Sequence, residues 1–218
     1  KGILGANGIV AAGTVIAAGA GLSIQTRQED QVVVCFFGDG GINKGTVHEA
    51  MNFCSVKNLP VVFVCENNQY AQFTSRKLTT SVSDLSLRGA AYGMPAVSMD
   101  GNDLLEVVEV SQKAIADARV GMGPTLVVAD TYRFGGHYVG DPQAYRSKEE
   151  VAQSRRRDPL LLFENHLILQ GLADKEALEL ERESILELVD KAVAFAEQSE
   201  YPEVRSVIDY VFTDVTEK

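Results

Sequence analysis

The chain has 218 residues, 45% of them hydrophobic, and a formal net charge of −10. This length allows one large domain, or a domain with an appendage, and supplies enough apolar residues for a core. The acidic balance argues against a nucleic-acid partner and favours solubility. The three cysteines (Cys35, Cys54 and Cys65) form no CxxC pair, which indicates reduced thiols and a cytoplasmic location.

The amino-terminal segment, residues 2–26, carries no charge and could be mistaken for a membrane span. It consists mostly of Ala and Gly with polar residues inside it, so it lacks the ~18–20 strongly apolar residues that a span requires. We therefore expect no membrane association and no signal peptide. Instead, residues 9–27 should form a buried helix whose small side chains permit the close approach of a neighbouring element.

A strand–helix–strand unit between residues 31 and 70 organises the chain. Residues 32–37 and 59–65 are apolar runs typical of strands buried on both faces, and residues 46–56 between them have helical spacing. The crossover in such a unit is right-handed, so the two strands are parallel and their carboxyl ends lie side by side. We therefore expect Asp39 and Asn68 at one edge of the sheet, where open α/β folds bind ligands.

The residue types at this edge predict a metal. Glycines at a strand-to-helix turn expose backbone N–H groups that suit a phosphate. The carboxylate of Asp39 would repel a phosphate unless a cation lay between them. Asp39 and the side-chain oxygen of Asn68 are hard ligands, suited to Mg²⁺ or Ca²⁺ rather than to zinc. The sequence therefore predicts a metal that bridges the protein to a diphosphate.

The spacing of these motifs resembles that of a known family. Gly38-Asp39-Gly40, followed after 26 residues by Asn67-Asn68, is similar to the thiamine-diphosphate signature. The surrounding segments (residues 5–10, 58–60, 65–68 and 132–137) are similar to the α-subunit of the E1 component of 2-oxoacid and acetoin dehydrogenase complexes. This resemblance covers nearly the whole chain. It implies the α/β thiamine-diphosphate-binding fold, with a mostly parallel sheet flanked by helices and a C-terminal helical appendage.

The resemblance also implies the ligands of the cofactors, thiamine diphosphate and Mg²⁺. Asp39, the side chain of Asn68 and the backbone carbonyl of Tyr70 match the metal ligands. Gly40 and Gly41 match the residues whose N–H groups bind the diphosphate. Two alternatives come from the residues alone: Asp39 could cap the next helix, and an asparagine at this turn could simply tolerate left-handed backbone.

Two further segments carry residues that match the family's site. Gly8 and Val10 would place backbone groups near the aminopyrimidine ring; taken alone, they would be a turn glycine and a core residue. Arg133 matches a residue near the phosphates or the pocket wall. His137 matches a histidine that contacts the diphosphate, and it is the only catalytic candidate here; taken alone, it would be a surface histidine. Tyr138 stands where mammalian relatives carry a regulatory phosphoserine, so no such switch is expected.

Two positions depart from the family's pattern, the first being Lys44, where the family usually has Gln. Family members commonly have Gly after the tyrosine of the second turn, whereas this chain has Ala71.

The rest of the chain predicts more sheet and then helices. Apolar runs predict strands at residues 96–99 and 125–132, with an amphipathic helix at 104–119 between them, a loop at 71–83 and a helix at 84–92. Beyond these, residues 148–157 and 159–170 should form a helical pair. Asp174 should cap a long helix to about residue 200, and residues 204–212 could be a strand or an extended arm.

We therefore expect a cofactor-binding α/β domain at residues 1–145 and a helical appendage at residues 146–218 that packs on it. In the resembled family, roughly a hundred residues precede the first segment seen here. The resemblance therefore implies that the N-terminal part of the family domain is missing from this chain.

The favoured function is that of an acetoin-cleaving E1 α-subunit. The resemblance implies a β-subunit that supplies the activating glutamate, an α₂β₂ heterotetramer, and transfer of the two-carbon unit to a lipoyl-bearing E2 acyltransferase. A pyruvate or branched-chain 2-oxoacid dehydrogenase is a close alternative.

Two other classes of function remain as alternatives. A Rossmann-type NAD-dependent dehydrogenase would use the same strand–turn–helix unit, but position 43 is Asn where its fingerprint requires a third glycine. A non-catalytic interaction fragment is the other alternative.

Overall fold

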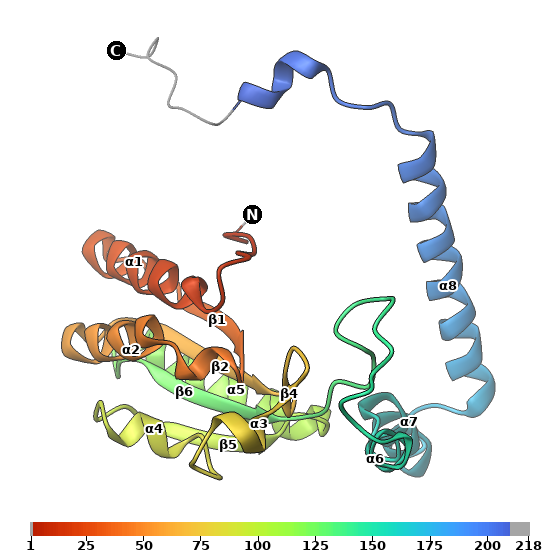
Figure 1. Cartoon of the computed structure of the whole chain (residues 1–218), viewed down its shortest axis with the longest axis horizontal. Helices are drawn as coiled ribbons and strands as arrows, with labels where there is room; N and C mark the ends of the chain where they lie inside the picture. The colour runs from red at the N-terminus through yellow and green to blue at the C-terminus, as the bar shows by residue number, and fades with distance from the viewer. Residues whose placement is uncertain (1, 210–218) are drawn as a thin grey trace. The chain divides into compact units, whose positions relative to one another are not determined.

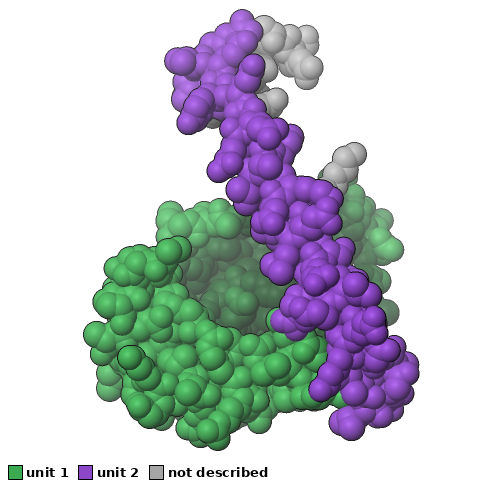
Figure 2. Space-filling view, turned by 90° about the vertical axis from the view of Figure 1, so that its right-hand side faces the viewer, with its two compact units in different colours: residues 1–165 green, residues 166–218 purple. Residues whose placement is uncertain are grey.

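The computed structural model describes residues 2–209 of the chain (Figure 1). The chain forms two compact units, Lys1–Asn165 and His166–Lys218, which Figure 2 colours separately. Compactness alone defines these units, and the predicted family-domain boundary at residue 145 stays a prediction.

The first unit is built on a four-stranded sheet in which neighbouring strands are all parallel, as predicted. In spatial order its strands are β1 (Val33–Gly38), β2 (Val61–Asn67), β6 (Thr125–Asp130) and β5 (Ala96–Asp100). The register places Gly38 opposite Glu66 and Asn67 opposite Asp130. The carboxyl ends of β1, β2 and β6 therefore lie level with one another. Strand β2 continues through Asn67, beyond its predicted end, because Asn67 still pairs with β6.

Helices cover both faces of this sheet. Leu126 and Val128 of β6 belong to one apolar core, and Val127 and Ala129 belong to the other. Strand β6 is thus apolar on both faces, which explains its continuous apolar run. The first core includes residues of α1 (Ala12–Arg27) and α2 (Gly45–Lys57), and the second includes residues of α5 (Leu104–Arg119).

Helix α1 begins at Ala12 rather than at the predicted residue 9. Ala11 has φ 64°, in the left-handed region, and so cannot continue a helix backwards. The side chain of Asn7 accepts a hydrogen bond from the N–H of Ile9 (2.8 Å), which makes a turn before the helix. The predicted close approach of small residues occurs within the helix, where a Cβ atom on Gly21 would lie 2.7 Å from Val61 Cγ2.

The predicted loop at residues 71–83 contains strands and a short helix, and the predicted helix at residues 84–92 is shorter than expected. Their elements are the hairpin β3 (Tyr70–Ala71) and β4 (Thr74–Ser75), followed by α3 (Arg76–Thr79) and α4 (Leu87–Ala90). Helix α4 starts later than predicted because the Asp84 carboxylate accepts hydrogen bonds from the N–H and the hydroxyl of Ser86, which forms a turn.

Helical segments follow the sheet: α6 (Lys148–Arg155), α7 (Pro159–Leu169), α8 (Lys175–Gln198) and η2 (Val204–Ile208). Asp174 caps α8 as predicted, since its carboxylate accepts the N–H of Ala177 (2.8 Å). Segment η2 is a 3₁₀ helix instead of a strand or arm, because the N–H and hydroxyl of Ser206 both donate to the carbonyl of Glu203. Residues 210–212 of that prediction lie outside the described residues.

No helix between residues 2 and 209 combines the length and the apolar character needed to cross a membrane.

Candidate functional site

Two turns follow adjacent strands at the carboxyl edge of the sheet. We call them the strand-end turns: residues 38–41 after β1 and residues 67–70 after β2. The backbone N–H groups of Asp39 and Asn68 both donate to the same oxygen, the carbonyl of Glu66, at 3.2 and 2.9 Å. Gly40 of the first turn also approaches Ala71, the residue that follows the second turn: a Cβ atom on Gly40 would lie 2.5 Å from the Cβ atom of Ala71. The structure therefore brings Asp39 and Asn68 together, as the topology of parallel strands requires.

We call the place where the two strand-end turns meet the corner. Asp39 is its buried carboxylate, with 1% of its surface exposed. Its Oδ1 atom accepts the N–H of Gly40 (2.9 Å), whereas its Oδ2 atom is buried without a hydrogen-bond partner. Burial raises the pKa of Asp39, although the N–H of Gly40 and the positive charge of Arg76 oppose this. Asp39 does not cap α2, whose N-cap position is Lys44. A buried oxygen without a partner is expensive unless a cation or a donor satisfies it.

Asn68 and Tyr70 form the other side of the corner. The Oδ1 atom of Asn68 accepts the N–H of Tyr70 (3.2 Å), which folds the side chain over its own turn. A carbonyl oxygen has a second lone pair, so this bond leaves room for one more partner. The ring of Tyr70 is buried, with 6% of the residue exposed.

Asn67, the first asparagine of the signature, is buried and makes a side-chain contact that the sequence did not predict. Its Nδ2 atom donates to the carboxylate of Asp130, while its Oδ1 atom is buried without a hydrogen-bond partner. The pairing follows from the strand register, which sets Asn67 opposite Asp130. The signal that could have found it is the polar residue at the same end of each run, once the two strands are known to be neighbours.

The segment before α1 lies against the glycine turn. A Cβ atom on Gly41 would lie 3.3 Å from Ala11 Cβ and 3.7 Å from Val10 Cγ1. Val10 is 56% exposed and Gly8 is also exposed, so neither is a core residue. The structure thus places Val10 beside the glycine turn, while Gly8 has nothing within 4 Å of a built Cβ atom.

The remaining site candidates lie on a loop after β6, residues 131–147, which we call the histidine loop. Asp141 is its central acceptor: it receives hydrogen bonds from the N–H of His137 (2.7 Å), the N–H of Gln143 (2.8 Å) and the hydroxyl of Tyr145 (2.8 Å). Burial alone would raise the pKa of Asp141, but these bonds and the nearby charge of Arg133 outweigh it and lower the pKa. The loop is therefore folded around one carboxylate.

The structure places Arg133 and His137 against the β3–β4 hairpin. Arg133 Nη2 donates to the carbonyl of Gln72 (2.6 Å) and to the hydroxyl of Tyr145 (2.9 Å). The ring of His137 is exposed and meets the ring of Phe73 edge-on, with centroids 5.7 Å apart. This hairpin directly follows the second strand-end turn, so both residues reach the same end of the sheet as Asp39 and Asn68.

Arg146 holds the histidine loop from its other end, a role that no motif of the sequence predicted. Its guanidinium lies over the rings of Tyr70 (5.6 Å), Tyr132 (5.3 Å) and Tyr145 (5.6 Å). One of its nitrogens donates to the backbone carbonyls of residues 134 (3.1 Å) and 135 (2.6 Å). Such cation–π contacts and charged hydrogen bonds are strong when partly buried.

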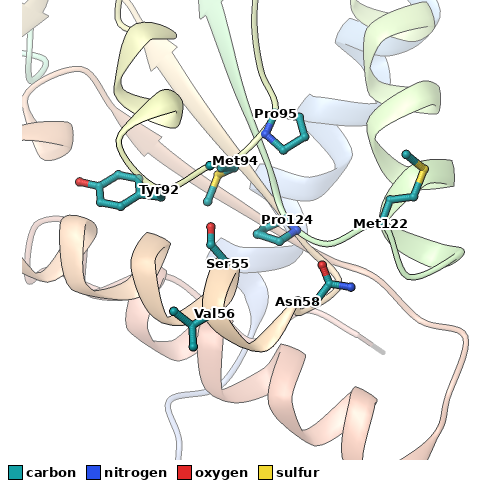
Figure 3. A pocket seen from close by; sticks show the side chains of 9 residues that line it. Ser55, Val56, Asn58, Tyr92, Met94, Pro95, Met122 and Pro124 are labelled. Carbon is teal, nitrogen blue, oxygen red and sulfur yellow. The ribbon is translucent and has the colours of Figure 1, made fainter.

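Two cavities lie elsewhere on the sheet. One, of about 200 Å³, is lined near the amino ends of β2, β5 and β6 by Asn58, Pro95 and Pro124 (Figure 3). It has no charged side chain in its lining and lies at the edge opposite to the strand-end turns, which does not suit a diphosphate. The other, of about 410 Å³, lies at the carboxyl ends of β5 and β6, beside Asp100 and Asp130.

Among residues 2–209, no three His, Cys, Asp or Glu side chains gather in a way that could hold a metal. A metal at the strand-end turns would therefore take Asp39 as the carboxylate of the predicted ligand set. Its other ligands would have to be amide, carbonyl and ligand oxygens, which are common partners of Mg²⁺.

Comparison with known proteins agrees with this geometry. The family model described as "Dehydrogenase E1 component" matches residues 1–205. The α-subunit of acetoin:2,6-dichlorophenolindophenol oxidoreductase from Bacillus subtilis is 42% identical, over 97% of this chain and 63% of that protein. A chloroplastic pyruvate dehydrogenase E1 α-subunit from Arabidopsis thaliana is 39% identical, over 97% of this chain and 51% of that protein. The 2-oxoisovalerate dehydrogenase α-subunit of Bacillus subtilis is 37% identical, over 88% and 59%.

The chain thus spans only part of the length of each of these relatives. The family resemblance of its motifs is confirmed, because the matching model covers nearly every residue. This chain belongs to the dehydrogenase E1 component family.

Proposed function

We propose that this protein acts as the α-subunit of an E1 enzyme that binds thiamine diphosphate through Mg²⁺ and cleaves acetoin. The observation that carries the proposal is the Oδ2 atom of Asp39, which is buried without a hydrogen-bond partner beside the turn of Asn68. A divalent cation shared with a diphosphate would satisfy that oxygen and neutralise the charge around it.

The residues of the corner fit this cofactor pair. Asp39 and Asn68 would supply hard oxygen atoms, and the backbone carbonyl of Tyr70 would supply a third, which is the ligand chemistry that Mg²⁺ prefers. Gly40 lacks a Cβ atom where one would meet Ala71, so the backbone of the two turns can approach closely. The N–H of Gly40 already donates to Asp39, and Gly41 is the next backbone donor toward a phosphate.

In this proposal the chain binds and orients, and its partner supplies part of the chemistry. When bound, thiamine diphosphate supplies a carbanion nucleophile and an electron sink for breaking the bond next to a carbonyl. Asp39, Asn68 and Tyr70 fix the metal, while Gly8 and Val10 border the space for the aminopyrimidine ring. Arg133 and His137 approach from the histidine loop, and His137 is the proposed proton-carrying group.

We further propose an α₂β₂ heterotetramer in the cytoplasm, in which a β-subunit supplies the activating glutamate and a lipoyl-bearing E2 acyltransferase accepts the product. Acetoin is favoured as substrate because the acetoin oxidoreductase subunit has the higher identity, 42% against 39% for the pyruvate enzyme and 37% for the 2-oxoisovalerate enzyme. Pyruvate and branched-chain 2-oxoacids are the alternatives within the same family.

Calorimetry and turnover test the two parts of this proposal separately. The chain is purified with its β-subunit and titrated with thiamine diphosphate, with and without Mg²⁺. We expect binding that requires the metal; metal-independent binding, or binding of NAD instead, would overturn the cofactor assignment. Turnover of acetoin, pyruvate and 2-oxoisovalerate is then compared with an artificial electron acceptor. A higher kcat/KM for either oxoacid would overturn the choice of acetoin alone.

A further inference from the structure

A single carboxylate oxygen joins three segments that are far apart in the sequence. The Oε1 atom of Glu150, on α6, accepts hydrogen bonds from the hydroxyl of Tyr70 and from the hydroxyl of Tyr132, each at 2.7 Å. Tyr70 ends the second strand-end turn, and Tyr132 begins the histidine loop. A buried tyrosine hydroxyl needs a partner, and both of these tyrosines take the same one.

The surroundings of Glu150 keep it ionised. Burial alone would raise the pKa of Glu150, but the two tyrosine hydroxyls and the charge of Arg146 outweigh this and lower it. Arg146 lies over the rings of both tyrosines, and its positive charge helps to lower the pKa of the carboxylate. Hydrogen bonds to a charged acceptor are about twice as strong as neutral ones. The pair of tyrosines is therefore held firmly and in a fixed direction.

Tyr70 connects this cluster to the metal corner. Its ring is held by Glu150, while its backbone N–H is bonded to the side chain of Asn68 and the next residue, Ala71, lies against Gly40. Movement of the ring would therefore shift the carbonyl of Tyr70 and the Oδ1 atom of Asn68 together. These are two of the three proposed protein ligands of the metal.

We propose that Glu150 is a positioning residue for the metal site, which acts through the hydroxyl of Tyr70 to fix the carbonyl of Tyr70 and the side chain of Asn68. This inference rests on the proposed function, because it assumes that Mg²⁺ binds at the strand-end turns. Glu150 touches neither the metal nor the cofactor in this scheme. Its contribution is that two ligands are already in place before the metal arrives, which is a form of preorganisation.

The test measures the Mg²⁺ concentration that half-saturates thiamine diphosphate binding, in the chain purified with its β-subunit. Glu150→Ala should raise that concentration about tenfold, because both hydroxyls lose their acceptor. Glu150→Gln keeps one side-chain oxygen as an acceptor and should restore most of the affinity. Glu149→Ala, an exposed neighbour on the same helix, is the matched control and should change nothing.

A double-mutant cycle separates positioning from mere support of the fold. In a Tyr70→Phe background, which keeps the ring and removes the hydroxyl, Glu150→Ala should cost little more affinity for Mg²⁺. In a Tyr132→Phe background, Glu150→Ala should still cause most of the tenfold loss of affinity for Mg²⁺. Tyr70→Phe alone should reproduce most of the effect, so the inference stays testable even if Glu150→Ala fails to fold.

The outcomes distinguish this inference from the function on which it rests. If the unchanged protein shows no Mg²⁺-dependent binding of thiamine diphosphate, both are overturned. If it shows such binding, but Glu150→Ala leaves the Mg²⁺ requirement unchanged, only the positioning role of Glu150 is overturned. Equal losses in the Tyr70→Phe and Tyr132→Phe backgrounds would also overturn it, because the effect would then not pass through Tyr70.

Discussion

The strand-end turns and the histidine loop lie at the same end of the sheet, but different forces hold them. The turns are fixed by backbone bonds: the N–H groups of Asp39 and Asn68 share the carbonyl of Glu66, and the register of β1 and β2 sets their height. The histidine loop is held by side chains, with Asp141 as its acceptor and Arg146 as its donor.

This difference teaches which changes should be local. A turn held by backbone bonds keeps its main-chain path when a side chain such as that of Asp39 is replaced by one of the same shape, so such a substitution removes chemistry and leaves the main chain in place. A loop held by a few charged side chains loses order when one of them is removed. When Asp39 is replaced in this way, the strand-end turns should thus lose the proposed metal binding without losing structure, whereas changes in the histidine loop should disturb structure more than binding.

The largest expected effect is a loss of cofactor affinity at the strand-end turns. Asp39→Asn keeps the shape of the side chain but removes the only carboxylate of the proposed ligand set. We expect the Mg²⁺-dependent affinity for thiamine diphosphate to fall about 100-fold or more, which corresponds to about 2.8 kcal/mol. Calorimetric titration at a fixed Mg²⁺ concentration measures this loss. Unchanged affinity would remove Asp39 from the metal site.

The stability of the same variant serves as its control. Burial raises the pKa of Asp39 in the folded chain, so ionisation of this group disfavours folding above that pKa. Without metal, Asp39→Asn should therefore not melt below the unchanged protein at neutral pH. Protonation of Asp39 removes this destabilisation of the unchanged protein. The difference in Tm between the unchanged protein and Asp39→Asn should therefore shrink as the pH falls through the raised pKa. A lower Tm for Asp39→Asn would mean that the carboxylate supports the fold.

The contrast between the two regions also decides what the sequence could predict. The corner of Asp39 and Asn68 was predictable because the right-handed crossover of parallel strands is a general rule that needs no knowledge of side-chain contacts. The contacts that tie the histidine loop to the β3–β4 hairpin were not, because they join distant residues: Arg133 bonds to the carbonyl of Gln72, 61 positions away in the sequence. No local pattern carries such a pairing.

Details of the backbone were not predicted for a related reason. The left-handed conformation of Ala11 delays the start of α1. It is rare for a residue with a Cβ atom, and the neighbouring residues do not predict it. The hairpin of β3 and β4 likewise lies where the sequence predicts a loop, because strands of two residues each are too short to show alternation. Sequence reasoning thus located the corner but not the segments that close around it.

The second expected effect tests the contact between the two turns. Gly40→Ala would place a Cβ atom 2.5 Å from that of Ala71, so we expect a loss of about 1–3 kcal/mol in the free energy of unfolding. The backbone of Gly40 is right-handed (φ −67°), so strain in φ does not contribute. Ala71→Gly should rescue the loss, and chemical denaturation measures both.

Gly45→Ala is the matched control for this pair, since a Cβ atom there would have nothing within 4 Å and would begin a helix. It should leave stability unchanged or slightly raised. An equal loss for Gly40→Ala with and without Ala71→Gly would contradict the close packing of the two turns.

The smallest expected effect on cofactor binding comes from changes in the histidine loop. The same changes should have the largest effect on how well that loop is ordered. Asp141→Asn removes the charge that gathers the N–H of His137 and the hydroxyl of Tyr145, so trypsin should cut after Arg133 or Arg146 about tenfold faster. Tyr145→Phe removes one of these bonds and should accelerate cleavage less. Mass spectrometry of the fragments gives both rates, and the affinity for thiamine diphosphate should change less than for Asp39→Asn. If Asp141→Asn is cut no faster than the unchanged chain, then side-chain bonds do not hold the loop, and the contrast with the backbone-held turns is lost.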